Sequence, residues 1–208
     1  MKYQIDDSNL DDRLAAALYQ PNATYISPAV IACFITSDDW SKQSLIELKE
    51  KTDAYLLVGL QTAGSEFEDL DIIDGVIKCR LDEIEEVVKL LDVKSASTLI
   101  AIDVVDIKYL FERAKHYQFI QSRISDTFES DAERSAVDQL ISQFPKDFKA
   151  KGLLVGMESS ESLSLDITTH IIEAIEKSVV IDNTDSFYCT SITDEPNSFH
   201  LKAIYAET

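Results

Sequence analysis

Two aspartates three residues apart, Asp103 and Asp106, are the side chains whose type and spacing could do chemistry in this sequence. They lie in the stretch AIDVVDIK, residues 101–108. One interpretation is structural: Asp103 caps the start of a helix and Asp106 lies near its positive end. The other is functional, because two carboxylates at a helix start could hold one Mg²⁺ ion together with several waters. The spacing alone allows both interpretations.

The glycines do not form a phosphate-binding loop. The sequence contains five, and no two are closer than four residues: Gly59, Gly64, Gly75, Gly152 and Gly156. A phosphate site needs several glycines together, so that backbone N–H groups can converge on the anion. Neither GxxxxGK[ST] nor GxGxxG occurs. We therefore expect no nucleotide cofactor, and no other cofactor is indicated.

The histidines and cysteines give no second candidate site. None of His116, His170 and His200 has another His or a Cys at metal-ligand spacing. His170 lies on an apolar helical stripe, which predicts a core or boundary position. Cys33 has no basic neighbour in sequence to lower the pKa of its thiol, so we do not expect a catalytic thiolate. No GxSxG motif surrounds any serine.

The composition favours a soluble protein. The 208 residues carry a formal net charge of -19, which opposes binding to nucleic acid and to anionic membranes. This charge serves either solubility or the docking of a basic partner. The start of the sequence has no signal-peptide pattern, and no run of about 18 apolar residues predicts a membrane span. The three cysteines are far apart and odd in number, which predicts free thiols in the cytoplasm.

Hydrophobic periodicity predicts alternating strands and helices. Helices are expected at residues 10–18, 41–51, 81–91, from 103, from 130 to 144 after a capping box of Ser130 and Glu133, and at 167–175. Strands are expected at residues 30–36, 54–60, 72–79, 119–125, 152–157, 186–192 and 199–205.

The order of these elements predicts an α/β fold in two parts. Strand, helix and strand over residues 30–60 indicate a parallel βαβ crossover. The last third indicates a two-layer α+β sandwich, in which residues 186–192 and 199–205 form an antiparallel hairpin. We place the boundary near residues 94–98, which gives a first domain of residues 1–97 and a second of 98–208.

From Asp103 onward, the sequence resembles the tubulin/FtsZ superfamily. Residues 102–108 match the later part of the N-x-D-x-x-D loop of FtsZ proteins, which leads into a helix. The order of several short downstream motifs is also similar: residues 131–134, the strand GLLV at 152–155, LSLD at 163–166 and the final strand at 199–206. Upstream, residues 30–34, 46–48 and 53–57 are more weakly similar, and residues 10–18 would be the helix that follows the family's glycine loop.

The resemblance implies the fold of this family without its nucleotide site. We expect a truncated GTPase-like α/β region at residues 1–97 and an FtsZ C-terminal-domain-like sandwich at 98–208. The GGGTGTG loop of the family has no counterpart, Ala101 replaces the loop asparagine, and residues 59–61 stand where a base-facing asparagine would be. The expectation is that the chain does not bind GTP in a pocket of its own.

The resemblance also implies a role for the acidic stretch. In the family the two loop aspartates enter the nucleotide pocket of the next subunit. Asp103 and Asp106 match these positions, and with Lys108 in the same stretch they are the expected partner-binding residues. This predicts a non-enzymatic assembly or interaction protein that caps or modulates an FtsZ-like polymer or contacts itself. The alternatives are a stand-alone homo-oligomeric scaffold and a divalent-metal-dependent enzyme that uses Asp103 and Asp106.

Overall fold

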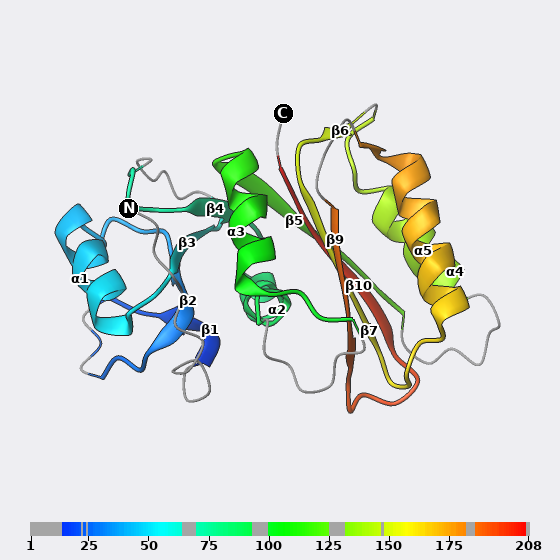
Figure 1. Cartoon of the computed structure of the whole chain (residues 1–208), viewed down its shortest axis with the longest axis horizontal. Helices are drawn as coiled ribbons and strands as arrows, with labels where there is room; N and C mark the ends of the chain where they lie inside the picture. Colours follow the sequence, from blue (N-terminus) through cyan, green and yellow to red (C-terminus); the bar gives the residue numbers. More distant parts are fainter. Residues whose placement is uncertain are drawn as a thin grey trace.

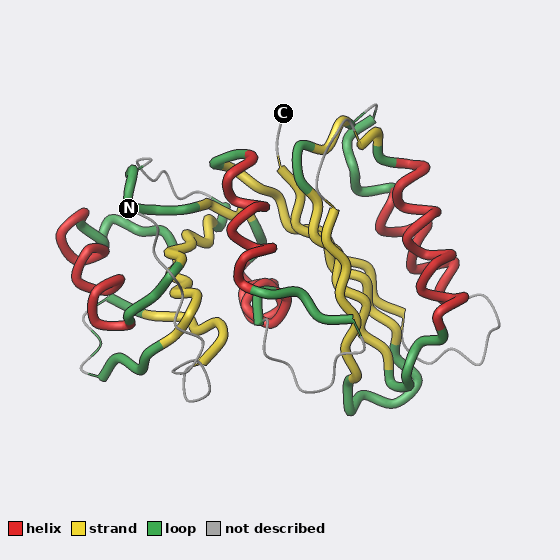
Figure 2. Tube along the Cα trace, in the orientation of Figure 1, coloured by secondary structure: helices red, strands yellow, loops and turns green. Residues whose placement is uncertain are grey.

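A single eight-stranded sheet with helices on both faces organises the protein (Figures 1 and 2). The computed structural model describes residues 14–21, 23, 25–63, 70–92, 100–124, 132–146, 148–181 and 186–206. The strand order is β1-β2-β3-β4-β5-β10-β7-β9. The strands are β1 Leu14–Tyr19, β2 Ala29–Ile35, β3 Leu56–Gln61, β4 Gly75–Lys78, β5 His116–Ile124, β7 Leu153–Ser159, β9 Ser186–Ile192 and β10 Phe199–Ala206. A separate pair consists of β6 Lys149–Ala150 and β8 Val180–Ile181.

The sheet is mixed. Strands β1 to β5 run parallel to one another, β10 pairs antiparallel with both β5 and β7, and β9 pairs parallel with β7. Every residue of β10 is buried, and so is every residue of β2 except the last. Strands covered on both faces read as continuous apolar runs, which explains why β2 was predictable from its sequence.

The helices lie in three groups, each over its own hydrophobic cluster. They are α1 Lys42–Thr52, α2 Ile84–Leu90 after a 3₁₀ turn at Leu81–Glu83, α3 Val104–Arg113, α4 Ala132–Ile141 and α5 Leu165–Ser178. Helices α2 and α3 share a cluster with Leu154 and Ile204, whereas α4 and α5 share one with Leu153 and Tyr205. Since neighbouring residues of a strand point to opposite faces, α3 and the α4–α5 pair cover opposite faces of the sheet.

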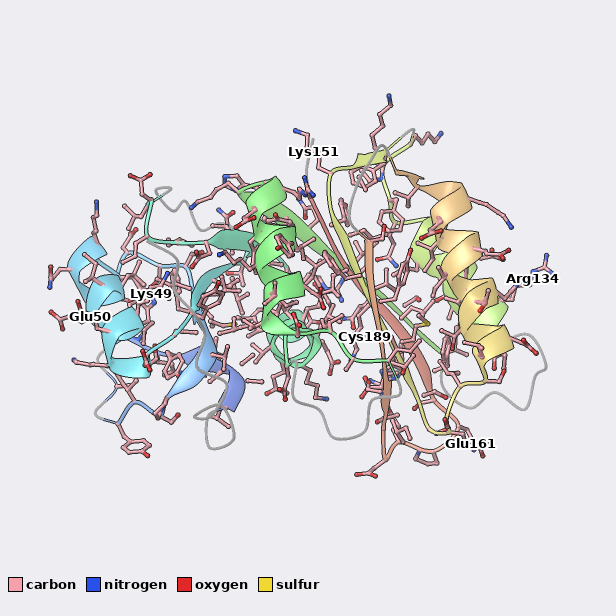
Figure 3. All side chains as sticks on the ribbon, viewed as in Figure 1. Lys49, Glu50, Arg134, Lys151, Glu161 and Cys189 are labelled. Atoms are coloured by element: carbon pink, nitrogen blue, oxygen red, sulfur yellow. The ribbon has the colours of Figure 1, made fainter. Side chains whose placement is uncertain are left out.

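The two ends of the molecule carry different helices. Figure 3 shows Lys49 and Glu50 on α1 at one end and Arg134 beside the α4–α5 pair at the other. Helix α1 packs on its own cluster over β2 and β3, through Leu45 and Leu48. No helix in the described ranges is long and apolar enough to cross a membrane.

The predicted α/β fold class is confirmed, with a parallel βαβ region followed by antiparallel strands under two helices. One continuous sheet joins these two regions, because β4 pairs with β5. Residues 93–99, around the predicted boundary, lie outside the described residues. The division into residues 1–97 and 98–208 therefore stays a prediction.

Two expected elements are wrong. The helix expected at residues 10–18 is strand β1 over residues 14–19, because pairing with β2 overrides a helical spacing of leucines and alanines. The expected hairpin of the last two strands does not form, because β7 lies between β9 and β10. Strand β10 is buried throughout and takes a central position with two neighbours, whereas half-exposed β9 forms the edge. The expected capping residue Ser130 lies outside the described residues.

Candidate functional site

Helix α3 begins at the acidic pair with a reciprocal capping arrangement. Oδ1 of Asp103 accepts hydrogen bonds from the backbone N–H groups of Val105 at 2.7 Å and Asp106 at 2.9 Å. Oδ2 of Asp106 accepts one from the backbone N–H of Asp103 at 2.9 Å. Three backbone donors that the helix cannot satisfy internally thus bond to the two carboxylates. The prediction that Asp103 caps the helix and that Asp106 lies in its first turn is therefore confirmed.

The acidic pair is nevertheless presented to the outside. Ile102 and Ile107, on either side of it, are 7% and 1% exposed and belong to the central hydrophobic cluster. Asp103 is exposed and Asp106 is half-buried. The two isoleucines hold the helix start firmly against the sheet, so the Asp103 carboxylate has a defined position at the surface.

Lys108, the third predicted partner-binding residue, lies one turn further along α3 and contacts its own chain. Its Nζ atom is 5.3 Å from the ring centroid of Tyr55 and 3.7 Å from Oε1 of Glu112. Contact with the Tyr55 side chain and, more weakly, with Glu112 raises the pKa of Lys108. The lysine remains a cation near the acidic pair at any physiological pH.

The acidic pair has few features of a metal site. One oxygen of each carboxylate, Oδ1 of Asp103 and Oδ2 of Asp106, already accepts hydrogen bonds from backbone N–H groups of the helix start. Within the described part of the chain, no three His, Cys, Asp or Glu side chains are grouped so that they could hold a metal ion. The capping geometry therefore gives no specific support to a metal-dependent reaction.

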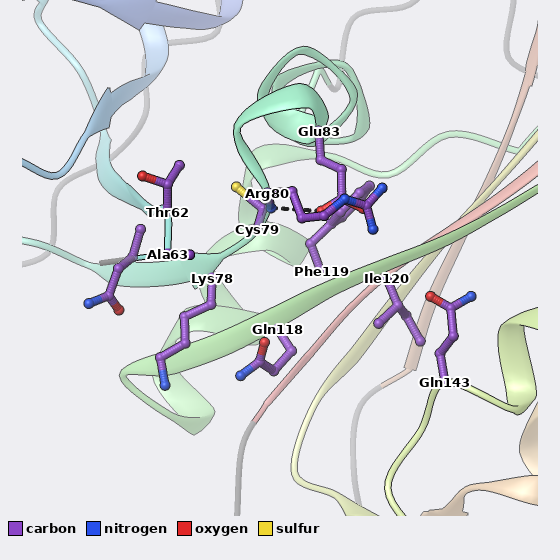
Figure 4. A pocket seen from close by; sticks show the side chains of 11 residues that line it. Thr62, Ala63, Lys78, Cys79, Arg80, Glu83, Gln118, Phe119, Ile120 and Gln143 are labelled. Atoms are coloured by element: carbon purple, nitrogen blue, oxygen red, sulfur yellow. Dashed lines mark hydrogen bonds and ion pairs between the residues drawn. The ribbon is translucent and has the colours of Figure 1, made fainter. Parts of the chain in front are cut away.

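A cleft at the carboxyl ends of β3 and β4 was not predicted from the sequence (Figure 4). It has a volume of about 440 Å³ and is lined by residues 61–63, 78–80 and 118–120, with Glu83 and Gln143. The carboxyl ends of parallel strands are the usual place for ligands in α/β sheets. A sequence signal existed, because the cationic residues Lys78 and Arg80 lie at the last position of β4 and two residues after it.

The cationic group of Arg80 in this cleft is paired with acids. Its Nε atom lies 3.2 Å from Oδ1 of Asp82, and Nη2 lies 2.9 Å from Oε1 of Glu83.

The thiol of Cys79 also lines this cleft. Burial raises its pKa to about 11, and the nearby carboxylates of Glu83 and Asp82 add to the shift. The thiol is therefore protonated at neutral pH and is a poor nucleophile.

The remaining cysteines and His170 can also be placed. Cys33 is fully buried, and burial raises the pKa of its thiol to about 12, in keeping with the expectation that it is not a catalytic thiolate. All three cysteines are free thiols. The prediction for His170 is wrong: the side chain is exposed, because α5 turns Thr168 rather than His170 toward the sheet.

No protein-family model and no curated protein matches the sequence. Solved structures do match. A mutant FtsZ of M. jannaschii superposes with a TM-score of 0.64 at 13% identity, covering 88% of this chain and 66% of that one. CetZ from Methanosaeta thermophila gives a TM-score of 0.58 at 13% identity, with 88% and 63% covered.

TubZ of Bacillus thuringiensis serovar israelensis gives a TM-score of 0.51 at 10% identity, covering 86% of this chain and 61% of that one. The chain therefore spans less than two thirds of the length of these neighbours. At such identities the likeness concerns the fold. It extends over nearly all of the present chain, on both sides of the acidic pair, and the chain accordingly has a tubulin/FtsZ-like fold.

Proposed function

We propose that this chain is a non-enzymatic assembly or interaction protein that contacts a tubulin-like polymer through the start of helix α3. The observation that carries the proposal is the exposed Asp103 carboxylate, held by its own helix beside Asp106. Both backbone hydrogen bonds to Asp103 reach Oδ1. Among the described residues nothing donates to Oδ2, so this oxygen is available to a partner while the cap stays intact.

The structural neighbours support a role in assembly. They include an empty FtsZ dimer from M. jannaschii, at a TM-score of 0.63, and GDP-form protofilaments of TubZ. We infer that the present chain also makes contacts between subunits. Its partner is then either such a polymer or a second copy of itself, and the contact caps or modulates assembly.

The glycines support the non-enzymatic part of the proposal. A Cβ atom on Gly75 would lie 2.6 Å from Cε1 of Phe111, and one on Gly156 would lie 2.5 Å from Cδ1 of Leu90. These glycines let helices α3 and α2 approach the sheet closely. They serve packing, and the sequence offers no glycine cluster that could bind a triphosphate instead.

Co-sedimentation with an assembled FtsZ polymer tests the proposal. We expect the wild-type chain to pellet with the polymer, or to change its assembly or GTP turnover. The variant Asp103→Asn with Asp106→Asn should lose most of this effect. Asn is as good a helix cap as Asp, so this variant removes the charge and keeps the helix.

The matched control is Glu47→Gln with Glu50→Gln, which removes two charges from exposed positions of α1. It should behave like the wild type. If the wild type neither pellets nor alters assembly or turnover, the proposal is wrong. If the control variant loses as much as the α3 variant, the contact is a general charge effect and α3 is not the binding surface.

A homo-oligomeric scaffold is the second candidate function, favoured by the β1 edge. Residues 14–37 contain no charged side chain, although the whole sequence has 57 of them (19 Lys and Arg with 38 Asp and Glu). Leu14 and Leu18 are 52% and 37% exposed on β1, at one end of the sheet. An uncharged edge strand is prone to pair with another chain. Light scattering that shows a closed oligomer of the wild type, and a smaller species for Leu18→Lys, would favour this function if the chain also fails to bind the polymer.

A further inference from the structure

The apolar surface of helix α5 is wider than its contact with the sheet. Thr168, Ile171 and Ile175 are the buried residues of this helix. Leu165 and Ile167 are 76% and 37% exposed. Two large aliphatic side chains therefore lie on the outside of α5, where a solvent-facing helix surface would normally carry polar residues.

The position of Thr168 explains why α5 can turn Ile167 away from the sheet. It is 3% exposed and faces the sheet, where a hydroxyl group needs a hydrogen-bond partner. The hydroxyl donates to the backbone carbonyl of Ser164 at 3.0 Å, within the first turn of its own helix. The sheet is therefore not required to satisfy Thr168, and Ile167 is turned toward the neighbouring helix α4 and solvent.

A groove runs between α4 and α5 at this place. Its volume is about 690 Å³. Its apolar lining comes from Val137 on α4 and from Ile167, Ile171 and Ala174 on α5. Helix α5 has 14 residues, a length of about 21 Å. Along α5 the lining runs from Asp166 to Ala174, a distance of about 12 Å, which corresponds to a little over two turns of a partner helix.

The rim of the groove is acidic. It carries three carboxylates, of Glu133, Asp138 and Asp166, beside the guanidinium of Arg134 and the imidazole of His170. Figure 3 shows Arg134 extending outward on this side of the molecule. An acidic rim around an apolar floor is complementary to a cationic segment with an apolar face.

We propose that the groove between α4 and α5 binds a basic amphipathic helix of a partner protein. The apolar face of such a helix covers Ile167 and the groove floor, and its lysines or arginines meet the rim carboxylates. A second copy of this chain is a poor occupant of this groove, because it would bring its own acidic rim against this one. An anionic membrane surface is disfavoured for the same reason.

This surface is independent of the proposed function. Helix α3, with the acidic pair, covers the other face of the sheet, as the two hydrophobic clusters show. A partner helix in the groove therefore leaves the start of α3 uncovered. A variant in the groove should leave co-sedimentation with FtsZ unchanged, so the two proposals can fail separately.

The test is fluorescence anisotropy with the full chain and a labelled Leu/Lys peptide. The peptide has about 15 residues, with its leucines on one helical face. A peptide of the same composition with scattered leucines is the control ligand. We expect the amphipathic peptide to bind the wild-type chain clearly more tightly than its scrambled isomer. Asp138→Lys and Ile167→Lys should each weaken binding by about tenfold.

Glu50→Lys on α1 is the matched variant, because it makes the same charge change at the opposite end of the molecule (Figure 3). It should weaken binding by less than about twofold. Ile167→Gln, a milder change at a partly exposed position, guards against misfolding of Ile167→Lys, and circular dichroism confirms that each variant is folded.

Several results would overturn the inference. Equal binding of the scrambled peptide, or equal loss in Glu50→Lys and Asp138→Lys, would show that net charge alone attracts the peptide. Unchanged binding in folded Ile167→Lys and Ile167→Gln would show that the groove is not used. If the wild type is a dimer and Ile167→Lys is a monomer, the groove binds a second copy of this chain instead.

Discussion

Leu90 of helix α2 lies directly over Gly156 of strand β7, with its Cδ1 atom 2.5 Å from where a glycine Cβ would be. The side chain thus occupies space that any other residue at position 156 would need. Helix α2 follows the parallel strand β4, whereas β7 belongs to the antiparallel part of the sheet. This contact therefore fastens together two regions that the sequence suggested as separate units.

Gly156→Ala should destabilise the protein by about 1–3 kcal/mol, because the added methyl group collides with Leu90. Urea unfolding of the wild type and the variant measures this loss. The double variant Gly156→Ala with Leu90→Ala is the control, since removing the Leu90 side chain makes room. Its loss should be smaller than the sum of the two single losses. Simple additivity would contradict the proposed collision.

Lys202 of β10 forms a second link to α2. Its side chain is 5% exposed, and Nζ contacts the carboxylates of Glu86 on α2 and Glu158 on β7. Lys202→Met should cost up to about 3–5 kcal/mol, because it leaves two half-buried carboxylates side by side without their buried cation. Adding Glu86→Gln and Glu158→Gln should recover much of the loss.

Lys89, whose side chain is 62% exposed and pairs with Glu86 at 3.3 Å, is the control. Lys89→Met should change the free energy of unfolding by less than about 1 kcal/mol. If Lys89→Met and Lys202→Met cost the same, burial of the ion pair does not determine its importance, and the link assigned to Lys202 is wrong.

Glu158 should make stability fall in acid. The pKa of Glu158 is lowered from 4.5 to about 2, mainly by contact with His200. Burial opposes this shift, and Lys202 adds to it. A carboxylate with a lowered pKa in the folded state stabilises the protein above its unfolded pKa. That contribution is lost as the pH falls from 4.5 toward about 2. The full contribution is roughly 3 kcal/mol.

The measurement is urea unfolding of the wild type and Glu158→Gln across this pH range. The advantage of the wild type should shrink steadily as the solution becomes more acidic. The same trend is expected from Glu86: burial raises its pKa, but Lys202 and Lys89 outweigh burial and lower it overall. An advantage that is constant with pH would contradict the ionic role of Glu158.

Asp103→Ala should cost about 0.5–2 kcal/mol, because the backbone N–H groups of Val105 and Asp106 lose their acceptor. Asp103→Asn should stay within a few tenths of a kcal/mol of the wild type, roughly as expected for exchanging two good caps. Thermal unfolding followed by circular dichroism separates the two. An equal loss in both variants would mean that the charge of Asp103, rather than its capping hydrogen bonds, stabilises helix α3.

Local signals in the sequence predicted local structure well. Asp103 and Asp106 predicted the start of α3, because a capping box involves neighbouring residues only. Likewise, the apolar run of β2 predicted a strand that is buried on both faces. Such features need no knowledge of distant partners.

Features that depend on distant residues were missed. The spacing of apolar residues in β1 suggested a helix, and only the pairing with β2 makes it a strand. Nothing near β9 and β10 indicates that β7 lies between them. The apolar stripe of α5 predicted a helix but not which of its residues face the sheet. Thr168 can face the sheet because its hydroxyl donates to the carbonyl of Ser164. The cleft beside β4 likewise requires residues 118–120, which are far away in sequence.

The central proposal is that this chain uses the tubulin/FtsZ-like fold for protein contacts and does not bind nucleotide itself. Isothermal titration of the 208-residue chain with GTP and Mg²⁺ tests it most directly. The account predicts no binding heat beyond dilution. Saturable binding of GTP by the isolated chain, with a Kd in the micromolar range or below, would contradict it.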